Sequence, residues 1–208
     1  MDSKVSTSTS KKASRPPEGQ LRDEQLVQIA AELFARKGYA GTSLRDIAEA
    51  AGITKAALYY WFPEKEQLFE RVVASRLAAL VDRVTQAAAQ GSDPVDRIRR
   101  IMRACAEHMD RDRAGWMASS DTFWSNFNQA QRDAVVPLRD RFEHTLRECV
   151  REAIETGQLR PADPAIATRL MLSGLNMLPR WHKPGGRLTA VQVVEQYLDI
   201  VLAGLLPR

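Results

Sequence analysis

The most informative part of the chain is a stretch near its N-terminus, residues 44–62, which reads LRDIAEAAGITKAALYYWF. Its spacing predicts two short helices that cross at a steep angle. Such a crossing needs a small residue at the contact, here Ala48, and a turn that tolerates a positive φ, here Gly52. Three apolar side chains are expected to fill the wedge between the helices: Ile47, Ile53 and Leu58. The stretch therefore predicts a helix-turn-helix that presents residues 54–60 to the major groove of DNA.

Local signals around this stretch predict a three-helix unit. We expect the first helix to begin at Asp23, a good N-cap, and to end at Gly38. The second should begin at Ser43, where Asp46 completes a capping box in place of the usual Glu, and the third at a Thr54 cap. The apolar face of the first helix has helical spacing and consists of Leu26, Ile29, Ala30, Leu33 and Phe34.

The rest of the chain also reads as helix, because strand-like alternation is absent and Gly and Pro breakers separate long periodic stretches. Further helices are expected over about residues 64–90, 94–110, 116–126, 129–156, 164–181 and 189–206. The sequence thus predicts an all-α fold of about nine helices. We divide it into a helix-turn-helix DNA-binding domain over residues 21–66 and a helical ligand-binding and dimerisation domain over residues 67–208.

Residues 1–20 are rich in Ser, Lys and Pro and lack apolar periodicity, so a disordered basic tail is expected there. The tail cations could lie in the minor groove beside the bound site, or the tail could be an inert extension. We favour the inert alternative. The cations concerned are Lys4, Lys11, Lys12 and Arg15.

The composition fits a polyanionic partner without requiring one. The formal net charge is +4, and the basic residues are not concentrated in one half of the chain. Cys105 and Cys149 are the only cysteines, so neither a disulfide framework nor a CxxC metal pattern is present. No apolar run approaches the ~18 residues that cross a membrane, and no signal peptide is evident. A cytoplasmic location is the simplest expectation.

Nothing in the sequence indicates catalysis. A nucleophile elbow, a phosphate-binding Gly loop and an HExxH pattern are all absent, so we expect neither enzyme activity nor a cofactor. Cys105 and His108 could share a helical face, but a soft-metal site needs three or four ligands. His144 and His182 are expected in other helices or at a helix end, so no metal is predicted.

Five short motifs together resemble the N-terminal signature of the TetR family of transcriptional regulators. They are FARKGY (34–39), TSLRDIA (42–48), AG (51–52), LYY (58–60) and FPEKE (62–66). The resemblance implies a helix-turn-helix repressor that binds DNA as a homodimer. Two positions depart from the signature: Trp61 replaces a common His and could alter a phosphate contact, and Glu64 places a negative charge near the DNA.

The resemblance also implies which residues contact DNA. Phosphate contacts are implied for Thr42, Ser43, Tyr59, Tyr60 and Lys65. Arg45 and Lys55 are the long donors, and the sequence leaves open which of them reads a base. The remaining candidates at the interface are Thr54, Ala56 and Trp61.

Large, adaptable side chains gather in the region after residue 100 and could line a cavity for a small apolar ligand. For each of them the alternative is a place in an ordinary helical core. The candidates are Met102, Cys105, His108, Met109, Trp116, Met117, Ser120, Phe123, Trp124, Phe127, Met177 and Trp181.

The last two helices carry more apolar residues than one bundle face needs, which indicates pairing with the same helices of a second copy. Candidate interface residues are Met171, Leu175, Tyr197, Val201 and Leu205. The family resemblance implies the same four-helix interface. Two-fold symmetry would place two reading helices on one face of DNA, so the operator should be an inverted repeat.

Residues 175–188 resemble family members that respond to acyl-CoA thioesters. A cationic cluster there could contact a CoA phosphate, or it could be a solvated helix end: Arg180, His182, Lys183 and Arg187. The sequence thus indicates a repressor released from operator DNA by a small apolar effector. Alternatives are a regulator without an effector, an activator, and an apolar-ligand carrier or enzyme that merely shares the helices.

Overall fold

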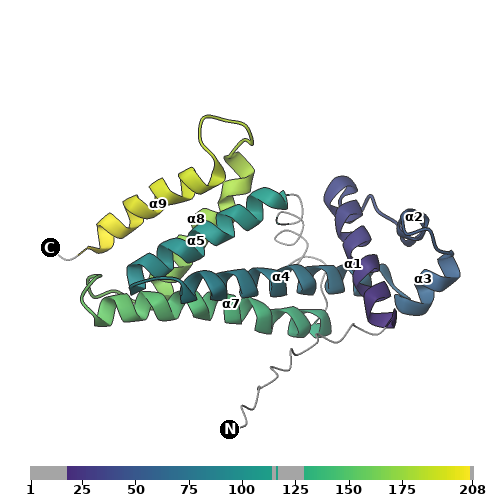
Figure 1. Cartoon of the computed structure of the whole chain (residues 1–208), viewed down its shortest axis with the longest axis horizontal. Helices are drawn as coiled ribbons and strands as arrows, with labels where there is room; N and C mark the ends of the chain where they lie inside the picture. The colour runs from purple at the N-terminus through teal and green to yellow at the C-terminus, as the bar shows by residue number, and fades with distance from the viewer. Residues whose placement is uncertain (1–17, 114–115, 117–128, 207–208) are drawn as a thin grey trace, which may run out of the picture.

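The computed structural model describes residues 18–113, 116 and 129–206 (Figure 1). Within these ranges the chain forms eight helices and no strand, which confirms the prediction of an all-α fold. The helices are α1 (Glu18–Lys37), α2 (Leu44–Ala50), α3 (Lys55–Trp61), α4 (Lys65–Ala89), α5 (Pro94–Arg111), α7 (Gln129–Glu155), α8 (Pro164–Trp181) and α9 (Ala190–Leu205).

From residue 64 onward the predicted helix ends agree with the observed ones to within one residue wherever the structure describes them. The helix predicted over residues 116–126 lies, apart from Trp116, outside the described residues. Within the described ranges, no helix is both long enough and apolar enough to cross a membrane.

The start of α1 differs from the prediction. The helix begins at Glu18, so residues 18–20 are helical and Asp23 is not its N-cap. Asp23 lies inside the helix, and its carboxylate accepts a hydrogen bond of 2.9 Å from Arg71 of α4. The residue type suited a cap, but its partner on α4 could not be known from local sequence.

The predicted caps of α2 and α3 are confirmed. The Ser43 side chain accepts from the Asp46 backbone N–H, and the Asp46 carboxylate accepts from the Ser43 N–H, which completes the capping box. Thr54 accepts from the Ala57 N–H at 3.1 Å. Gly38 and Gly52 adopt positive φ values of 74° and 64°, as the turns after α1 and α2 require.

Two hydrophobic clusters share α4. The first joins α1, α2 and α3 to the early part of α4, up to Val73. The second joins the later part, from Leu80, to α5, α7, α8 and α9. Leu77 packs against both clusters. The packing therefore changes over between Ala74 and Leu80.

Arg76 bridges the two units at this changeover. Its guanidinium donates to the backbone oxygen of Ala31 in α1 at 3.1 Å, and its Nε lies 3.0 Å from the Asp112 carboxylate. Asp112 is the C-cap of α5. A single side chain of α4 thus connects the unit of α1–α3 to the end of α5.

The helices of the second unit surround the later part of α4. The unit α1–α3 lies at one end of the molecule, and α4 extends from it with α7 alongside (Figure 1). Helix α5 packs on α4, α7 and α9, and α8 packs on α7 and α9. Val135 of α7 is also buried in the first cluster, so α7 reaches the unit of α1–α3 directly.

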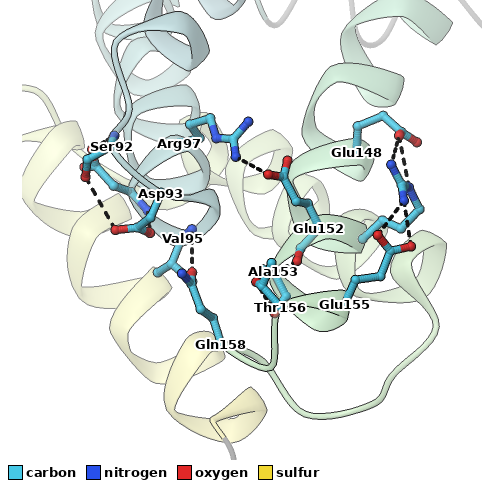
Figure 2. Close-up of polar contacts among 12 residues, drawn as sticks. Ser92, Asp93, Val95, Arg97, Glu148, Glu152, Ala153, Glu155, Thr156 and Gln158 are labelled. Carbon is cyan, nitrogen blue, oxygen red and sulfur yellow. Dashed lines mark hydrogen bonds and ion pairs between the residues drawn. The ribbon is translucent and has the colours of Figure 1, made fainter.

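Polar contacts hold together the end of the molecule that is remote from α3. Arg97 of α5 pairs with Glu152 of α7 at 2.7 Å, and the backbone N–H of Val95 donates to the Gln158 side chain at 3.4 Å (Figure 2). They tie the first turn of α5 to the end of α7 and to the turn that follows it. Because the ion pair is partly exposed, it contributes about 1 kcal/mol or less to stability.

Helices α8 and α9 approach closely at Gly174. A Cβ built on this residue would clash with Cζ of Tyr197. The Tyr197 hydroxyl donates to the backbone oxygen of Leu170 at 2.6 Å, which fixes the ring in that place. The absence of a side chain at position 174 is therefore what allows the two helices to pack this closely.

Replacing Gly174 with Ala should lower the free energy of unfolding by about 1–3 kcal/mol, because the Tyr197 ring must move and lose its hydrogen bond. Chemical denaturation followed by circular dichroism measures the change. Gly204→Ala in α9 is the matched control, since a Cβ there meets nothing within 4 Å. The control should be neutral or stabilising by about 0.5–1 kcal/mol. Equal effects of the two substitutions would contradict the close approach.

Candidate nucleic-acid interface

The outer face of α3 carries large side chains that the protein does not bury. Tyr60 is 83% exposed, and Tyr59 and Trp61 are 40% and 38% exposed. Leu58 next to them is fully buried and anchors α3 to the first cluster. The rings of Tyr60 and Trp61 meet edge to face, with centroids 5.9 Å apart. The three aromatics therefore do not fill a core within this chain, and the face is open to a partner.

Lys55 is the cation at the start of α3. It is exposed, and its ammonium lies over the Tyr59 ring, 5.2 Å from the centroid. A cation–π contact at an exposed site is worth about 0.5–1 kcal/mol, enough to favour one direction of the side chain. The cation and the tyrosine hydroxyl thus share one face of α3, as a contact with phosphate or a base edge requires.

The N-terminus of α2 is held by charge as well as by hydrogen bonds. Both hydrogen bonds from Ser43 hold the pKa of the Asp46 carboxyl far below its usual value, and Lys37 at 3.2 Å adds to the effect. The carboxylate is consequently ionised at neutral pH. Arg45, the other long donor predicted at the interface, is exposed on α2.

Thr42 differs from its predicted role as a phosphate contact. The residue is 1% exposed, and its hydroxyl donates to the backbone oxygen of Gly38 at 2.8 Å. Its side chain therefore closes the end of α1 and is not presented to DNA. Ser43, Thr54 and Ala56, by contrast, are exposed, although the first two also cap α2 and α3.

Lys65, another predicted phosphate contact, lies at the first position of α4 and is half-buried. Its ammonium donates to the backbone oxygens of Tyr39 and Thr42 and lies over the Tyr39 ring. The Tyr39 hydroxyl in turn donates to Glu66 at 2.7 Å. The pKa of Tyr39 is raised, mainly by burial and also by its hydrogen bond to the Glu66 carboxylate. The same hydrogen bond lowers the pKa of Glu66.

A surface hollow of about 580 Å³ brings several of these residues together. It lies between the α1–α2 loop, α3 and the start of α4. Its lining consists of Ala40, Gly41, Thr42, Ser43, Leu44, Asp46, Tyr59, Pro63, Glu64, Lys65 and Glu66. Four predicted phosphate contacts, Thr42, Ser43, Tyr59 and Lys65, therefore border one depression, together with three carboxylates.

Sequence reasoning missed three residues that shape this surface. Lys37 pairs with Asp46, Tyr39 lies under the Lys65 ammonium, and Glu66 accepts from Tyr39. All three belong to motifs already quoted for the family resemblance. Their partners lie 9 to 27 positions away along the chain, so helical spacing gave no signal for these contacts.

The predicted effector residues fall into four groups. Met102, Cys105 and Met109 are fully buried in the second cluster. His108 is half-buried, with its ring 6.2 Å from that of Trp116, and burial lowers its pKa. The candidates that lie outside the described residues are Met117, Ser120, Phe123, Trp124 and Phe127.

The two candidates on α8, Met177 and Trp181, lie elsewhere. They are 51% and 59% exposed, on the outer side of the helix. The outward face of α8 and α9 also includes Ile166, Leu170 and Ile200. Met177 and Trp181 are therefore on the surface of this chain and do not belong to the buried group around Met102.

The residues predicted for the dimer interface pack toward the core of this chain. Met171 and Leu175 are buried in the second cluster, and Val201 and Leu205 are half-buried against it. The ring of Tyr197 lies against Gly174 of the same chain. Because α8 is apolar around much of its circumference, the sequence did not show which side faces the core, and the choice of Met171 and Leu175 as surface residues is corrected by their burial.

The cationic cluster predicted at the end of α8 has three exposed members and one buried member. Arg180, Lys183 and Arg187 are exposed. His182 is 7% exposed, and its Nε2 lies 2.9 Å from the backbone oxygen of Leu188. Arg113 donates to the backbone oxygens of Pro179 and His182, which fixes this turn against the end of α5.

Two family models match the chain. Residues 26–72 match "Bacterial regulatory proteins, tetR family", and residues 91–205 match "Tetracyclin repressor-like, C-terminal domain". The transcriptional repressor KstR2 of Mycolicibacterium smegmatis is 31% identical over 191 residues, covering 91% of this chain and 93% of the relative. Both regions of the chain are thus similar to one family.

Solved structures agree with the sequence matches. The TetR-family regulator PfmR from Thermus thermophilus is 35% identical with a TM-score of 0.77, covering 88% of this chain and 100% of that one. AibR, solved in complex with isovaleryl coenzyme A and operator DNA, is 26% identical with a TM-score of 0.77, covering 87% of this chain and 98% of that one. With its exposed reading helix and these matches across both units, the chain belongs to the TetR family of DNA-binding transcriptional repressors.

Proposed function

We propose that the chain represses transcription as a homodimer on an inverted-repeat operator and is released by a small apolar effector. The observation that carries the DNA-binding part is the outer face of α3, where Lys55, Tyr59 and Tyr60 are all exposed. A folded protein seldom leaves several aromatic side chains together in water unless a partner covers them. Because bacterial DNA lies in the cytoplasm, the protein would act there.

Lys55 and the two tyrosines would divide the contacts between bases and phosphates. An ammonium at the start of a reading helix can donate to guanine or to phosphate, whereas a tyrosine hydroxyl is suited to phosphate. Arg45 on α2 is the second candidate for a base contact. Which of the two cations selects sequence is left to experiment.

Selection from a random-sequence duplex pool should enrich an inverted repeat. Lys55→Ala and Tyr59→Ala should each weaken binding to the enriched duplex, by about 1–3 kcal/mol for Lys55 if it reads a base. Fluorescence anisotropy at fixed salt measures both affinities. Arg151→Ala is the matched control, since it removes a cation from α7 that pairs with Glu148 and Glu155 at the remote end.

The control should leave operator affinity within about twofold, because exposed charges beyond a Debye length of ~10 Å are largely screened. Failure to enrich any sequence, even after the protein has been stripped of bound ligand, would contradict the operator proposal.

The outward apolar face of α8 and α9 supports the proposed homodimer. Ile166, Leu170, Met177 and Trp181 follow helical spacing along α8 and are each more than half exposed. Ile200 on α9 is 75% exposed. A self-complementary patch of this kind pairs with its own copy about a two-fold axis, which would place two α3 helices on one side of DNA.

Leu170→Glu should convert the dimer to a monomer, because a carboxylate would be buried opposite apolar side chains of the second copy. Light scattering coupled to size-exclusion chromatography measures the molecular mass. Ala79→Glu, an added charge on an exposed position of α4, should leave the mass unchanged. A Leu170→Glu protein that stays dimeric would show that another face joins the copies.

We propose an acyl-CoA thioester as the effector class. The support is twofold: AibR, a structural neighbour at 26% identity, was solved with isovaleryl coenzyme A, and Arg180, Lys183 and Arg187 are exposed cations near the end of α8. Apolar side chains around His108 and Trp116 would contact the acyl group. To shift the protein from mostly bound to mostly released, the effector must favour the released state by about 5.5 kcal/mol.

Thioesters of increasing acyl length, beginning with isovaleryl-CoA, should raise the melting temperature and release the enriched duplex, whereas free CoA should do neither. At 100 times its dissociation constant a ligand stabilises by about 2.7 kcal/mol, a shift that thermal fluorescence resolves. Stabilisation by another apolar compound, and by no thioester, would move the effector to a different class. No response to any compound would favour the alternative of a regulator without an effector.

A further inference from the structure

The Lys65 ammonium is engaged mainly within the protein. An ammonium has three N–H donors. Two of them reach the backbone oxygens of Tyr39 at 3.0 Å and Thr42 at 3.1 Å. The same nitrogen lies 4.1 Å from the centroid of the Tyr39 ring. Most of the bonding capacity of this cation is thus used on the loop between α1 and α2.

The neighbouring contacts hold the same loop from other directions. The Tyr39 hydroxyl donates to Glu66, next to Lys65 on α4. The buried Thr42 hydroxyl donates to the backbone oxygen of Gly38, just after α1, at 2.8 Å, and lies 3.4 Å from that of Leu33 in α1. The next residue, Ser43, caps α2. The first turn of α4 therefore fixes the segment that leads directly into α2.

We propose that Lys65 is a positioning residue of the DNA interface. By binding the two loop carbonyls it sets where Ser43 and the N-terminus of α2 lie relative to α3. This role differs from a phosphate contact, which adds affinity through charge and leaves sequence preference unchanged. It also explains why Lys65 is half-buried, whereas Lys55 is exposed.

The two roles predict different behaviour for Lys65→Met, which keeps the aliphatic stem and removes the donors. Loss of positioning should weaken binding to the enriched duplex at least tenfold more than binding to a scrambled duplex of the same composition. Loss of a phosphate contact should weaken both duplexes equally. It should also reduce the slope of log K against log salt by about 0.9 per phosphate.

Hydrogen exchange of the DNA-free protein tests the positioning directly and requires no operator. Lys65→Met should speed exchange across residues 39–46 while leaving exchange in α5, α8 and α9 unchanged. Lys65→Arg should restore slow exchange and sequence preference, because a guanidinium can donate to both carbonyls and stack on the Tyr39 ring. Failure of the Arg variant to restore either property would count against the proposal.

Lys55→Met is the matched control, since this lysine also lies over a tyrosine ring but is exposed on α3. It should change DNA binding and leave exchange across residues 39–46 as in the parent protein. Unchanged exchange in Lys65→Met would overturn the proposal whatever happens to affinity. Equal weakening on both duplexes with a reduced salt slope would identify Lys65 as a phosphate contact instead.

Discussion

The described structure depends on one constraint, that α4 must pack into two cores at once. Its early part buries Phe69 and Val73 against α1 and α2, and its later part buries Leu80 and Val84 against the remaining helices. A helix of 25 residues at 1.5 Å per residue is about 37 Å long. Because its hydrogen bonds run unbroken between the two cores, a rotation or shift of one end is carried to the other.

Two further contacts join the units beside α4. Arg76 connects the Ala31 carbonyl of α1 to Asp112 at the end of α5, and Val135 of α7 is buried in the first cluster. Under the proposed function, a ligand near His108 would lie one helical turn from Asp112. A change in that turn would act on α1 through the contacts of Asp112 with Arg76 and of Arg76 with Ala31, and α1 packs against the unit that holds α3.

The DNA-binding unit separates two uses of positive charge. Lys55 is exposed over Tyr59, where its charge can reach DNA, while Lys65 is turned inward onto backbone carbonyls. Ser43 and Thr54 fix the starts of α2 and α3 by side-chain caps. The interface is therefore built on short helices whose ends are fixed before DNA binds, which limits the ordering cost of binding.

The sequence was sufficient for features that arise from interactions within a few residues. The capping box at Ser43, the positive φ at Gly52 and the span of α8 between Asp163 and His182 all depend on neighbours in the chain. Contacts between distant positions were not accessible in this way, because side-chain type does not reveal a partner on another helix. Asp23 pairs with Arg71, Lys65 binds the loop at residues 39–42, and the core takes Met171 while Leu170 faces outward. Each of these contacts was decided by how the helices pack in space. By local rules alone, Asp23 could equally well cap a helix, Lys65 could contact phosphate, and Met171 could face outward.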